Sequence, residues 1–236
     1  MATIGIFDSG AGGLSVLKEL RRQLPHEHYV YYADNAHCPY GEKSAEYIRS
    51  RADAITALLL EKGAQAIVVA CNTATAAAIA HLRETYPVPF VGMEPAVKAA
   101  AACTRSGVVG VLATAGTLKA AKYRDTKERY AEGVQVVEAI GRGFVERVER
   151  LELDGAETEA AVRSCLQPLL AAGADVIVLG CTHYPFLLPV IRRICGPDVR
   201  IIDPAPAVAR RLSDVLATAG IPLEQETGGG SLTLLS

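Results

Sequence analysis

Two stretches of the chain nearly repeat each other, and a cysteine lies at the same place in both. The first reads GAQAIVVACNTAT (63–75) and the second reads GADVIVLGCTHYP (173–185). Both run from Gly-Ala through mostly apolar residues to a small residue, then to cysteine and a cluster of polar residues. Cys71 and Cys181 therefore occupy matching positions, 110 residues apart. This repetition indicates two thiols with related roles.

Two opposed thiols are suited to inverting a stereocentre. One group must remove a proton from one face of a carbon while the other delivers a proton to the opposite face, and the roles swap in the reverse direction. A thiolate paired with a thiol can do both. A cysteine just before a helix has its thiolate favoured by the exposed N–H groups and the helix dipole. The pattern predicts Cys71 and Cys181 as the two acid–base groups.

Other interpretations of these cysteines stay open. Two buried structural cysteines at homologous points of a duplicated fold would give the same pattern. A metal site would need more ligands than the pairs Cys181-x-His183 and His37-Cys38 offer, so we expect no metal. A cysteine nucleophile with His183 as its base would leave the twin Cys71 unexplained.

A second candidate cluster follows the first predicted strand. The segment FDSGAGGLSV (7–16) places Asp8 and Ser9 before a glycine-rich turn that leads into a helix. Its spacing is not that of the dinucleotide-binding fingerprint, but N–H groups at a helix N-terminus can still bind a carboxylate. Asp8 could accept hydrogen bonds from a substrate ammonium, orient a thiol, or cap the next helix.

Neutral polar groups near other strand ends suit the same kind of ligand. The loop CPYGEKS (38–44) contains a proline and is equally consistent with an ordinary turn that Ser44 caps. The neutral candidates for ligand binding are Tyr40, Gly41, Asn72, Thr73, Thr75 and Thr114. The sequence has no phosphate cradle with a lysine and no recognisable pyridoxal lysine site. It therefore predicts a small zwitterionic ligand handled without a cofactor.

Composition narrows the class of protein. The chain has 236 residues, half of them hydrophobic, and a net charge of −2, so it can bury a core and lacks the basic footprint of a nucleic-acid-binding protein. Its opening, MATIGIFDSG, does not resemble a signal peptide. The longest apolar stretch, 64–80, has Asn72, Thr73 and Thr75 at its centre, which is atypical of a membrane span. We expect a cytoplasmic protein with no membrane or nucleic-acid partner.

The elements that position these residues alternate along the chain. Predicted strands cover 3–7, 28–33, 66–70, 88–91, 108–112, 134–138, 175–179 and 199–202. Predicted helices lie near 12–24, 44–62, 73–86, 95–104, 115–130, 143–151, 156–172, 186–194 and 205–219. Strands that alternate with helices predict an α/β fold with mostly parallel sheets, and such folds bind ligands at the carboxyl ends of their strands.

The repeat extends beyond the cysteines. GIFDSGAGGL (5–14) resembles GVLATAGTL (110–118), so each half opens with a strand, a Ser or Thr turn and a helix. We expect two pseudo-symmetric α/β lobes, each with a mostly parallel sheet flanked by helices, and an active site in the cleft between them. The expected divisions are an N-terminal lobe 1–94, a C-terminal lobe 95–204, a segment 205–220 that returns to the first lobe, and a tail 221–236 that contains a weak strand pattern, SLTLLS.

Taken together, these motifs resemble those of the aspartate/glutamate racemase family, and within it the glutamate racemases. They are FDSGAGGLSV, PYGEKS, VACNTAT, EPA and LGCTHYP in this order, and the resemblance covers roughly residues 3–220. It implies cofactor-independent interconversion of L- and D-glutamate, which supplies D-glutamate for peptidoglycan, by a homodimer. The nearest alternative is an aspartate or other amino-acid racemase of the family. The alternative from another class is a two-lobe protein that binds a small anion without chemistry.

The resemblance also implies roles for single residues. Cys71 and Cys181 match the two catalytic cysteines, with Cys71 acting on the D-isomer and Cys181 on the L-isomer. Asp8 and His183 match residues that assist the thiols. The substrate-contacting positions of the family are matched by Asp8, Ser9, Tyr40, Gly41, Asn72, Thr73, Thr182 and His183.

One segment departs from the family pattern. Many members carry a CPLFVPLVE-like segment after the mid-chain strand, and its glutamate assists catalysis. Here residues 141–149 read GRGFVERVE, so the Cys-Pro is absent. Glu149 takes the place of the assisting glutamate, with Glu146 as its rival. Family members usually continue with another helix, so we expect a truncated or unusual end.

Overall fold

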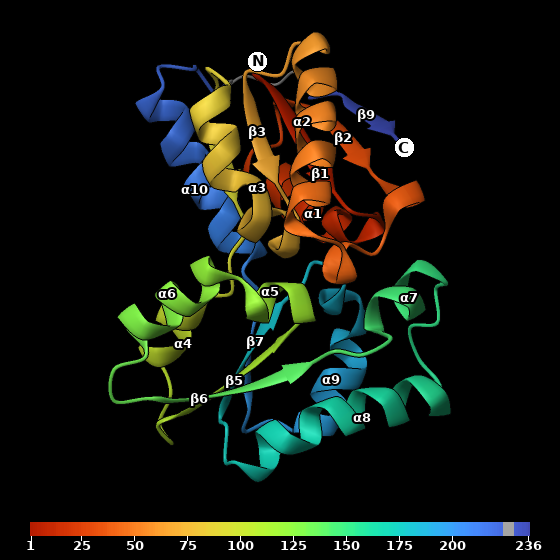
Figure 1. Cartoon of the computed structure of the whole chain (residues 1–236), viewed down its shortest axis with the longest axis vertical. Coiled ribbons are helices and arrows are strands. Elements are labelled where there is room, and N and C mark those ends of the chain that lie inside the picture. Colours follow the sequence, from red (N-terminus) through yellow and green to blue (C-terminus); the bar gives the residue numbers. More distant parts are fainter. Residues whose placement is uncertain (224–228) are drawn as a thin grey trace. The chain divides into compact units, whose positions relative to one another are not determined.

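The computed structural model describes residues 1–223 and 229–236. Contacts divide the chain into two compact units, and many elements of both are labelled in Figure 1. Unit 1 comprises Met1–Met93 together with Ala205–Ser236, and unit 2 comprises Glu94–Pro204. Each unit has its own parallel sheet with helices packed against it. No helix in the described ranges is both long and apolar enough to cross a membrane.

Unit 1 is built on a five-stranded sheet in the order β4-β3-β1-β2-β9, and all its strand pairs are parallel. Its strands are β1 (Thr3–Asp8), β2 (His28–Ala33), β3 (Ala66–Val69), β4 (Phe90–Gly92) and β9 (Leu232–Leu235). The central strands β1 and β3 are almost entirely buried. Burial on both faces is expected of a parallel sheet that helices cover on each side.

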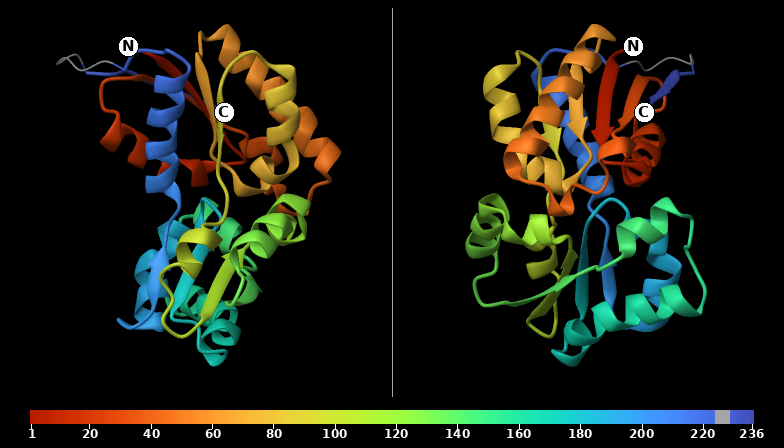
Figure 2. Two further views of the ribbon diagram at one scale, coloured as in Figure 1. Left: turned by 90° about the vertical axis from the view of Figure 1, so that its left-hand side faces the viewer. Right: turned by 45° about the vertical axis from the view of Figure 1, so that its right-hand side comes forward.

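Helices cover both faces of this sheet. They are α1 (Leu14–Gln23), α2 (Ala45–Glu61), α3 (Asn72–Thr85) and α10 (Ala205–Thr218). One face packs against α1 and α10, where Leu20 and Leu212 belong to the same core cluster as Ile6. The other face packs against α2 and α3 through a second cluster. Helix α10, blue in Figures 1 and 2, comes from the end of the chain and completes the core of unit 1.

Unit 2 has a four-stranded parallel sheet in the order β6-β5-β7-β8. Its strands are β5 (Val108–Ala113), β6 (Gln135–Ile140), β7 (Val176–Gly180) and β8 (Arg200–Ile202). Its helices are α4 (Val97–Ala101), α5 (Ala115–Lys119), α6 (Ala121–Tyr130), α7 (Phe144–Glu149), α8 (Ala156–Ala171) and α9 (Leu188–Cys195). The central strands β5 and β7 are again buried.

The two sheets have the same topology. Four strands of unit 1 run in the order β4-β3-β1-β2, and unit 2 repeats this order as β8-β7-β5-β6. In both sheets the first strand lies between the second and the third. Cys71 follows the third strand of one sheet, and Cys181 follows the third strand of the other. The prediction of an α/β fold with two parallel sheets is confirmed, and the matching cysteines lie at equivalent points of one topology.

The predicted elements agree with the structure except in a few places. All eight predicted strands are present with ends within two residues, and SLTLLS provides β9, which pairs with β2. The single helix predicted over 115–130 is two helices, because Ala120 has an extended backbone (φ −69, ψ 138). The helix predicted over 186–194 is preceded by a 3-10 turn, η4 (Tyr184–Leu187). The part of the predicted tail at 224–228 lies outside the described residues.

Candidate active site

Cys71 lies at the N-terminus of α3, two residues after β3 ends. Its backbone is extended, and its Sγ accepts a hydrogen bond from the Ala74 N–H at 3.4 Å. The hydroxyl oxygen of Ser9 lies 3.9 Å from this sulfur. The Cys71 residue is only 5% exposed. Because backbone N–H groups at a helix start stabilise negative charge, the local geometry favours a thiolate that can accept a proton.

Asp8 holds the glycine-rich turn that follows β1. The buried carboxylate accepts hydrogen bonds from the N–H groups of Gly10 and Gly13, both at 3.1 Å. Gly13 allows this close approach, because a Cβ there would lie 2.6 Å from the Cβ of Asp8 and 2.7 Å from the Tyr31 hydroxyl. The carboxylate thus fixes the backbone that carries Ser9 towards Cys71. These contacts agree with the predicted use of Asp8 in organising the start of the next helix, and its use towards a substrate ammonium or a thiol stays a prediction.

Tyr40 belongs to a buried network. Its hydroxyl donates to the Asp34 carboxylate at 2.5 Å, and Arg51 on α2 binds the same carboxylate through Nε at 3.0 Å and Nη2 at 2.8 Å. Burial raises the pKa of Tyr40 well above its usual value, and the hydrogen bond to Asp34 raises it further. Tyr40 therefore stays protonated and is a structural donor. Gly41 follows it in a short 3-10 turn, η3 (Tyr40–Glu42).

Sequence reasoning missed two members of this network, Asp34 and Arg51. The hydrogen bond to Asp34 raises the pKa of Arg51, so its charge is permanent. Asp34 looked like one more polar residue of a loop, and Arg51 lies 17 residues further along the chain. The available signal was a carboxylate directly after β2, at the strand end where α/β folds gather functional groups.

Asn72 has an unused acceptor in a buried place. Its Nδ2 donates to the Met93 carbonyl oxygen at 3.4 Å, while its Oδ1 has no hydrogen-bond partner among the described residues. The carbonyl can only accept, so the amide nitrogen must face it and the oxygen is left over. A buried polar atom without a partner costs about 1–3 kcal/mol. A ligand with an N–H donor would remove this cost.

The predicted threonines of α3 and α5 have different surroundings. The Thr75 hydroxyl donates to the Val69 carbonyl at 3.1 Å and accepts from the Met93 N–H at 2.9 Å, so it ties the end of β3 to the segment after β4. Thr114 caps α5 by accepting the Thr117 N–H at 3.2 Å. Thr73 is buried in the first turn of α3, beside Asn72.

Cys181 directly follows β7 and has an imidazole beside it. The sulfur lies 3.8 Å from Nδ1 of His183, and the Thr182 hydroxyl lies 3.4 Å from the same nitrogen. On the other side of the ring, Nε2 of His183 lies 2.6 Å from the carboxylate of Glu149, the last residue of α7. Cys181 and His183 are 6% and 1% exposed. Glu149, and not its rival Glu146, thus meets the imidazole.

These groups form a thiol–imidazole–carboxylate array. A carboxylate accepts hydrogen bonds, so Nε2 of His183 carries a proton and Nδ1 can accept one from Cys181. The negative charge of Glu149 then stabilises the imidazolium that results. Activation of a thiol by an adjacent base that a third group orients is the usual arrangement for a reactive cysteine. The array can therefore draw a proton from Cys181 and return it.

The other cysteines contrast with this pair. None of the six forms a disulfide. Burial raises the pKa of the Cys165 thiol, and it raises that of Cys195 to about 11. Both therefore stay protonated near neutral pH and are poor acid–base groups. They are half-buried, as expected of cysteines that act as small apolar residues.

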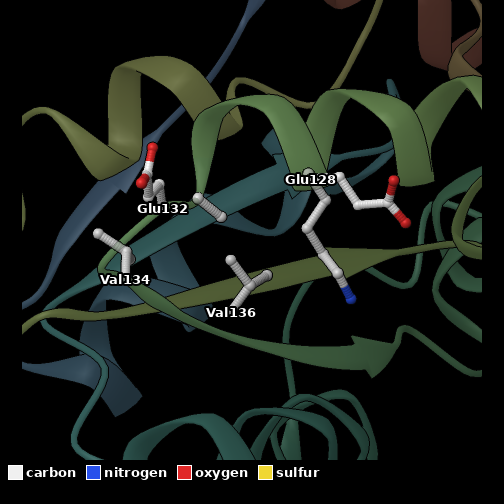
Figure 3. A pocket seen from close by; sticks show the side chains of 6 residues that line it. Glu128, Glu132, Val134 and Val136 are labelled. Carbon is white, nitrogen blue, oxygen red and sulfur yellow. The ribbon is translucent and has the colours of Figure 1, made fainter.

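A hollow of about 370 Å³ in unit 2 lies apart from these groups. It lies between α6 and β6, and Figure 3 shows Glu128, Glu132, Val134 and Val136 around it. Lys127 and Ala131 complete the lining. Its lining contains none of the predicted site residues, so the candidate site rests on the strand ends and not on this hollow.

Comparisons with known proteins agree with the geometry. The profile of the family described as Asp/Glu/Hydantoin racemase matches residues 4–212. A glutamate racemase from Stutzerimonas stutzeri is 55% identical over 217 residues, which cover 92% of this chain and 82% of that protein. The crystal structure of a glutamate racemase from Escherichia coli, in complex with L-glutamate and the activator UDP-MurNAc-ala, has a TM-score of 0.88 at 35% identity and covers 100% of this chain and 89% of that one. A Bacillus anthracis glutamate racemase has a TM-score of 0.87 at 36% identity, with coverage of 99% and 86%. The chain therefore belongs to the Asp/Glu/Hydantoin racemase family.

Proposed function

We propose that this protein is a glutamate racemase, which interconverts L- and D-glutamate by removing the proton from one face of the α-carbon and delivering another proton to the opposite face. Cys71 and Cys181 are its two acid–base groups, and no cofactor takes part. Family membership and relatives more than 50% identical support the activity. The mechanism is carried by one observation: a thiol follows the third strand in each of two sheets that share one topology.

Each thiol has the neighbours that proton transfer requires. In one direction the Cys71 thiolate removes the α-proton, and the Cys181 thiol delivers its own proton to the opposite face of the carbon. The two cysteines exchange these states in the reverse direction. Helix N–H groups and Ser9 support charge on Cys71, and His183 with Glu149 supports it on Cys181.

The remaining predicted residues divide into two groups. We propose that Ser9, Asn72, Thr73 and Thr182 contact the substrate, and that the unpaired Oδ1 of Asn72 accepts from its ammonium group. Asp8, Thr75, Thr114 and the hydroxyl of Tyr40 instead hold the backbone near the site, which agrees with their hydrogen bonds to neighbouring backbone groups and to Asp34. Gly41 stays a predicted substrate contact. The two compact units are then the lobes predicted at 1–94 with 205–220 and at 95–204.

Circular dichroism of D-glutamate incubated with the protein tests this function. We expect the signal to decay to zero, with one deuteron taken up at the α-carbon in deuterated water. Cys71→Ser and Cys181→Ser should each lower turnover on the order of 10²–10⁴-fold, the usual contribution of an acid–base group. Cys103→Ser, a change of the same chemistry outside the site, is the matched control. Near-normal racemisation by both single variants would contradict the mechanism. Faster turnover of aspartate than of glutamate would instead indicate an aspartate racemase.

We also propose the setting in which the enzyme works. It acts in the cytoplasm, where thiols stay reduced, and the lack of disulfides among its six cysteines agrees with that compartment. The reaction supplies D-glutamate for peptidoglycan. It forms a homodimer, as the resemblance to the family implies, and light scattering coupled to size exclusion would test this by giving twice the chain mass.

A further inference from the structure

Three residues of unit 2 form an aromatic contact beside the His183–Glu149 pair. Phe144 begins α7 and Tyr184 begins η4, and both side chains are fully buried. Their ring centroids lie 5.1 Å apart in an edge-to-face arrangement. The carbonyl oxygen of Gly141 accepts the Tyr184 hydroxyl at 3.4 Å and the Phe144 N–H at 3.3 Å. We call Gly141, Phe144 and Tyr184 the aromatic clamp.

The aromatic clamp is connected to both residues of the His183–Glu149 pair. Tyr184 is covalently joined to His183, and its N–H donates to the Cys181 carbonyl at 3.2 Å. Phe144 and Glu149 are the first and last residues of the same helix. The path therefore runs from Tyr184 to Phe144, along α7 to Glu149, and back through the 2.6 Å bond to His183. Movement of the Tyr184 ring displaces both partners of that bond.

Helix α7 depends on such an anchor. It has only six residues, and isolated helices shorter than about 12–15 residues are marginal in water. It begins after Gly143, which is left-handed (φ 73), and Leu151 after it is also left-handed (φ 60). No side-chain hydrogen bond caps the N-terminus of this helix. The packing of Phe144 against Tyr184 is therefore one of the contacts that hold Glu149 in place, together with buried Val145 and Val148. The hydrogen bond from Arg147 to Thr158 adds a further anchor for the helix.

The close fit at Gly141 gives the clamp its precision. A Cβ at this position would lie 2.5 Å from the Tyr184 hydroxyl, 2.6 Å from the adjoining ring carbon and 3.0 Å from Phe144. Ordinary contact begins at 3.4 Å, so even one methyl group requires the tyrosine ring to move by about 0.9 Å. Burial raises the pKa of Tyr184 far above its usual value, so its hydroxyl stays a donor and takes no part in proton transfer.

We propose that Gly141, Phe144 and Tyr184 are positioning residues that fix the His183–Glu149 pair and, through it, the protonation of Cys181. The proposal rests on the proposed function only in so far as Cys181 is the thiol that this pair serves. It makes Gly141 a determinant of thiol reactivity, although glycine has no side chain that could touch a substrate.

Alkylation of the two thiols as a function of pH tests the proposal in the full chain without relying on turnover. Iodoacetamide is the probe, and mass spectrometry of the cysteine peptides reports Cys71 and Cys181 separately. In Gly141→Ala we expect Cys181 to be alkylated more slowly than in the unaltered protein across the pH range, because the His183–Glu149 pair no longer meets the thiol in the same geometry. His183→Asn should give the same profile. The Cys71 profile should stay unchanged, since that thiol belongs to unit 1.

Turnover supplies the second readout. We expect Gly141→Ala to lower kcat on the order of 10²-fold with little change in KM, the cost of misplacing a catalytic group by about 1 Å. Tyr184→Phe, made alone, keeps the ring and should therefore give nearly normal values in both readouts. Gly110→Ala is the matched control, because its Cβ would crowd Leu169 at 3.0 Å in the core of the same unit.

Two outcomes would overturn the clamp. One is a Gly141→Ala protein whose Cys181 profile and kcat match those of Gly110→Ala. The other is a change of equal size in the Cys71 and Cys181 profiles, which would indicate general destabilisation. Should Gly141→Ala not fold, Phe144→Leu carries the same test, since it keeps the apolar volume and removes the ring contact. If the unaltered protein had no racemase activity but Gly141→Ala still changed the alkylation of Cys181, the proposed function would be refuted and the aromatic clamp would stand.

Discussion

Cys71 and Cys181 have different neighbours, although they occupy equivalent points of one topology. Cys71 has a hydroxyl and a helix N–H beside its sulfur, and Cys181 has an imidazole that a carboxylate orients. Proton transfer at Cys181 therefore depends on the titration of a neighbouring base, whereas that at Cys71 depends on fixed dipoles. The proton-transfer steps at the two thiols should therefore respond differently to pH and to substitution, although kcat/KM stays equal in the two directions of the overall reaction.

Replacing Glu149 with glutamine tests the role of this carboxylate at the scale of one residue. The amide keeps the size of the side chain but cannot stabilise an imidazolium. We expect kcat to fall on the order of 10²-fold, within the range of acid–base assistance. Because the enantiomers are equally stable, kcat/KM must fall equally in both directions, which circular dichroism of initial rates can verify. Glu146→Gln, on the same helix, is the control, and equal losses in both variants would contradict the role of Glu149.

Residue types at the strand ends were the part of the candidate site that could be read from the sequence. The repeated strand–cysteine motif led directly to Cys71 and Cys181 and to the polar residues next to them. Asp34 and Arg51 could not be found in this way, because their roles come from contacts between separate elements. Thr75 shows the converse. Its type and place suggested a ligand contact, but sequence does not reveal that both hydrogen bonds of its hydroxyl go to backbone.

At the scale of elements, the site depends on loops that buried polar networks hold to rigid helices. Asp34 at the end of β2 joins the Tyr40 turn to Arg51 on α2. This network places the loop before α2 beside Cys71, whose charge also raises the pKa of Tyr40. The connection is therefore structural support for the thiol of unit 1, as the aromatic clamp is for that of unit 2.

Removing the cation of this network should destabilise the protein. Breaking a buried ion pair by removing one partner costs ~3–5 kcal/mol. The Arg51 side chain is 25% exposed, so we expect Arg51→Met to lower the free energy of unfolding by about 3 kcal/mol, the lower end of that range. Urea denaturation measures the change. Arg49→Met, the control, alters an exposed arginine of the same helix and should change the free energy of unfolding little. An equally small change in Arg51→Met would show that Asp34 does not need its partner.

The boundaries of elements show where sequence patterns stop being informative. Strands were found because runs of Val, Ile and Ala are enclosed by glycine and polar residues. The break between α5 and α6 occurs at Ala120, a good helix former, and neither glycine nor proline marks it. The edge strand β9 had only a weak alternation, and its place beside β2 depends on a long-range pairing.

At the scale of the whole molecule, unit 1 consists of two segments and unit 2 of one. Helix α10 buries Val208, Leu212 and Leu216 in the core of unit 1. Fully burying such side chains contributes ~1.5–3 kcal/mol each, so these three account for roughly 5–9 kcal/mol. That amount is comparable with the whole stability of a domain, about 5–15 kcal/mol.

Ending the chain after residue 204 should therefore unfold unit 1 and leave unit 2 folded. Hydrogen exchange would show rapid exchange throughout β1 and β3 and retained protection in β5 and β7. Ending the chain after residue 220 removes only the segment with β9 and should preserve protection in both sheets, which makes it the matched control. Protected β1 and β3 in the shorter protein would mean that α10 is not required for the core of unit 1.

The late arrival of α10 has a consequence for biosynthesis. More than 100 residues separate the two segments of unit 1 in the chain. A ribosome adds roughly 5–20 residues per second, so the first segment waits about 5–20 s before its missing helix is made. During that interval the part of the sheet face that α10 covers is exposed, while the middle of the nascent polypeptide is already able to fold. We therefore expect unit 2 to complete its fold before unit 1, although unit 1 contains the start of the chain.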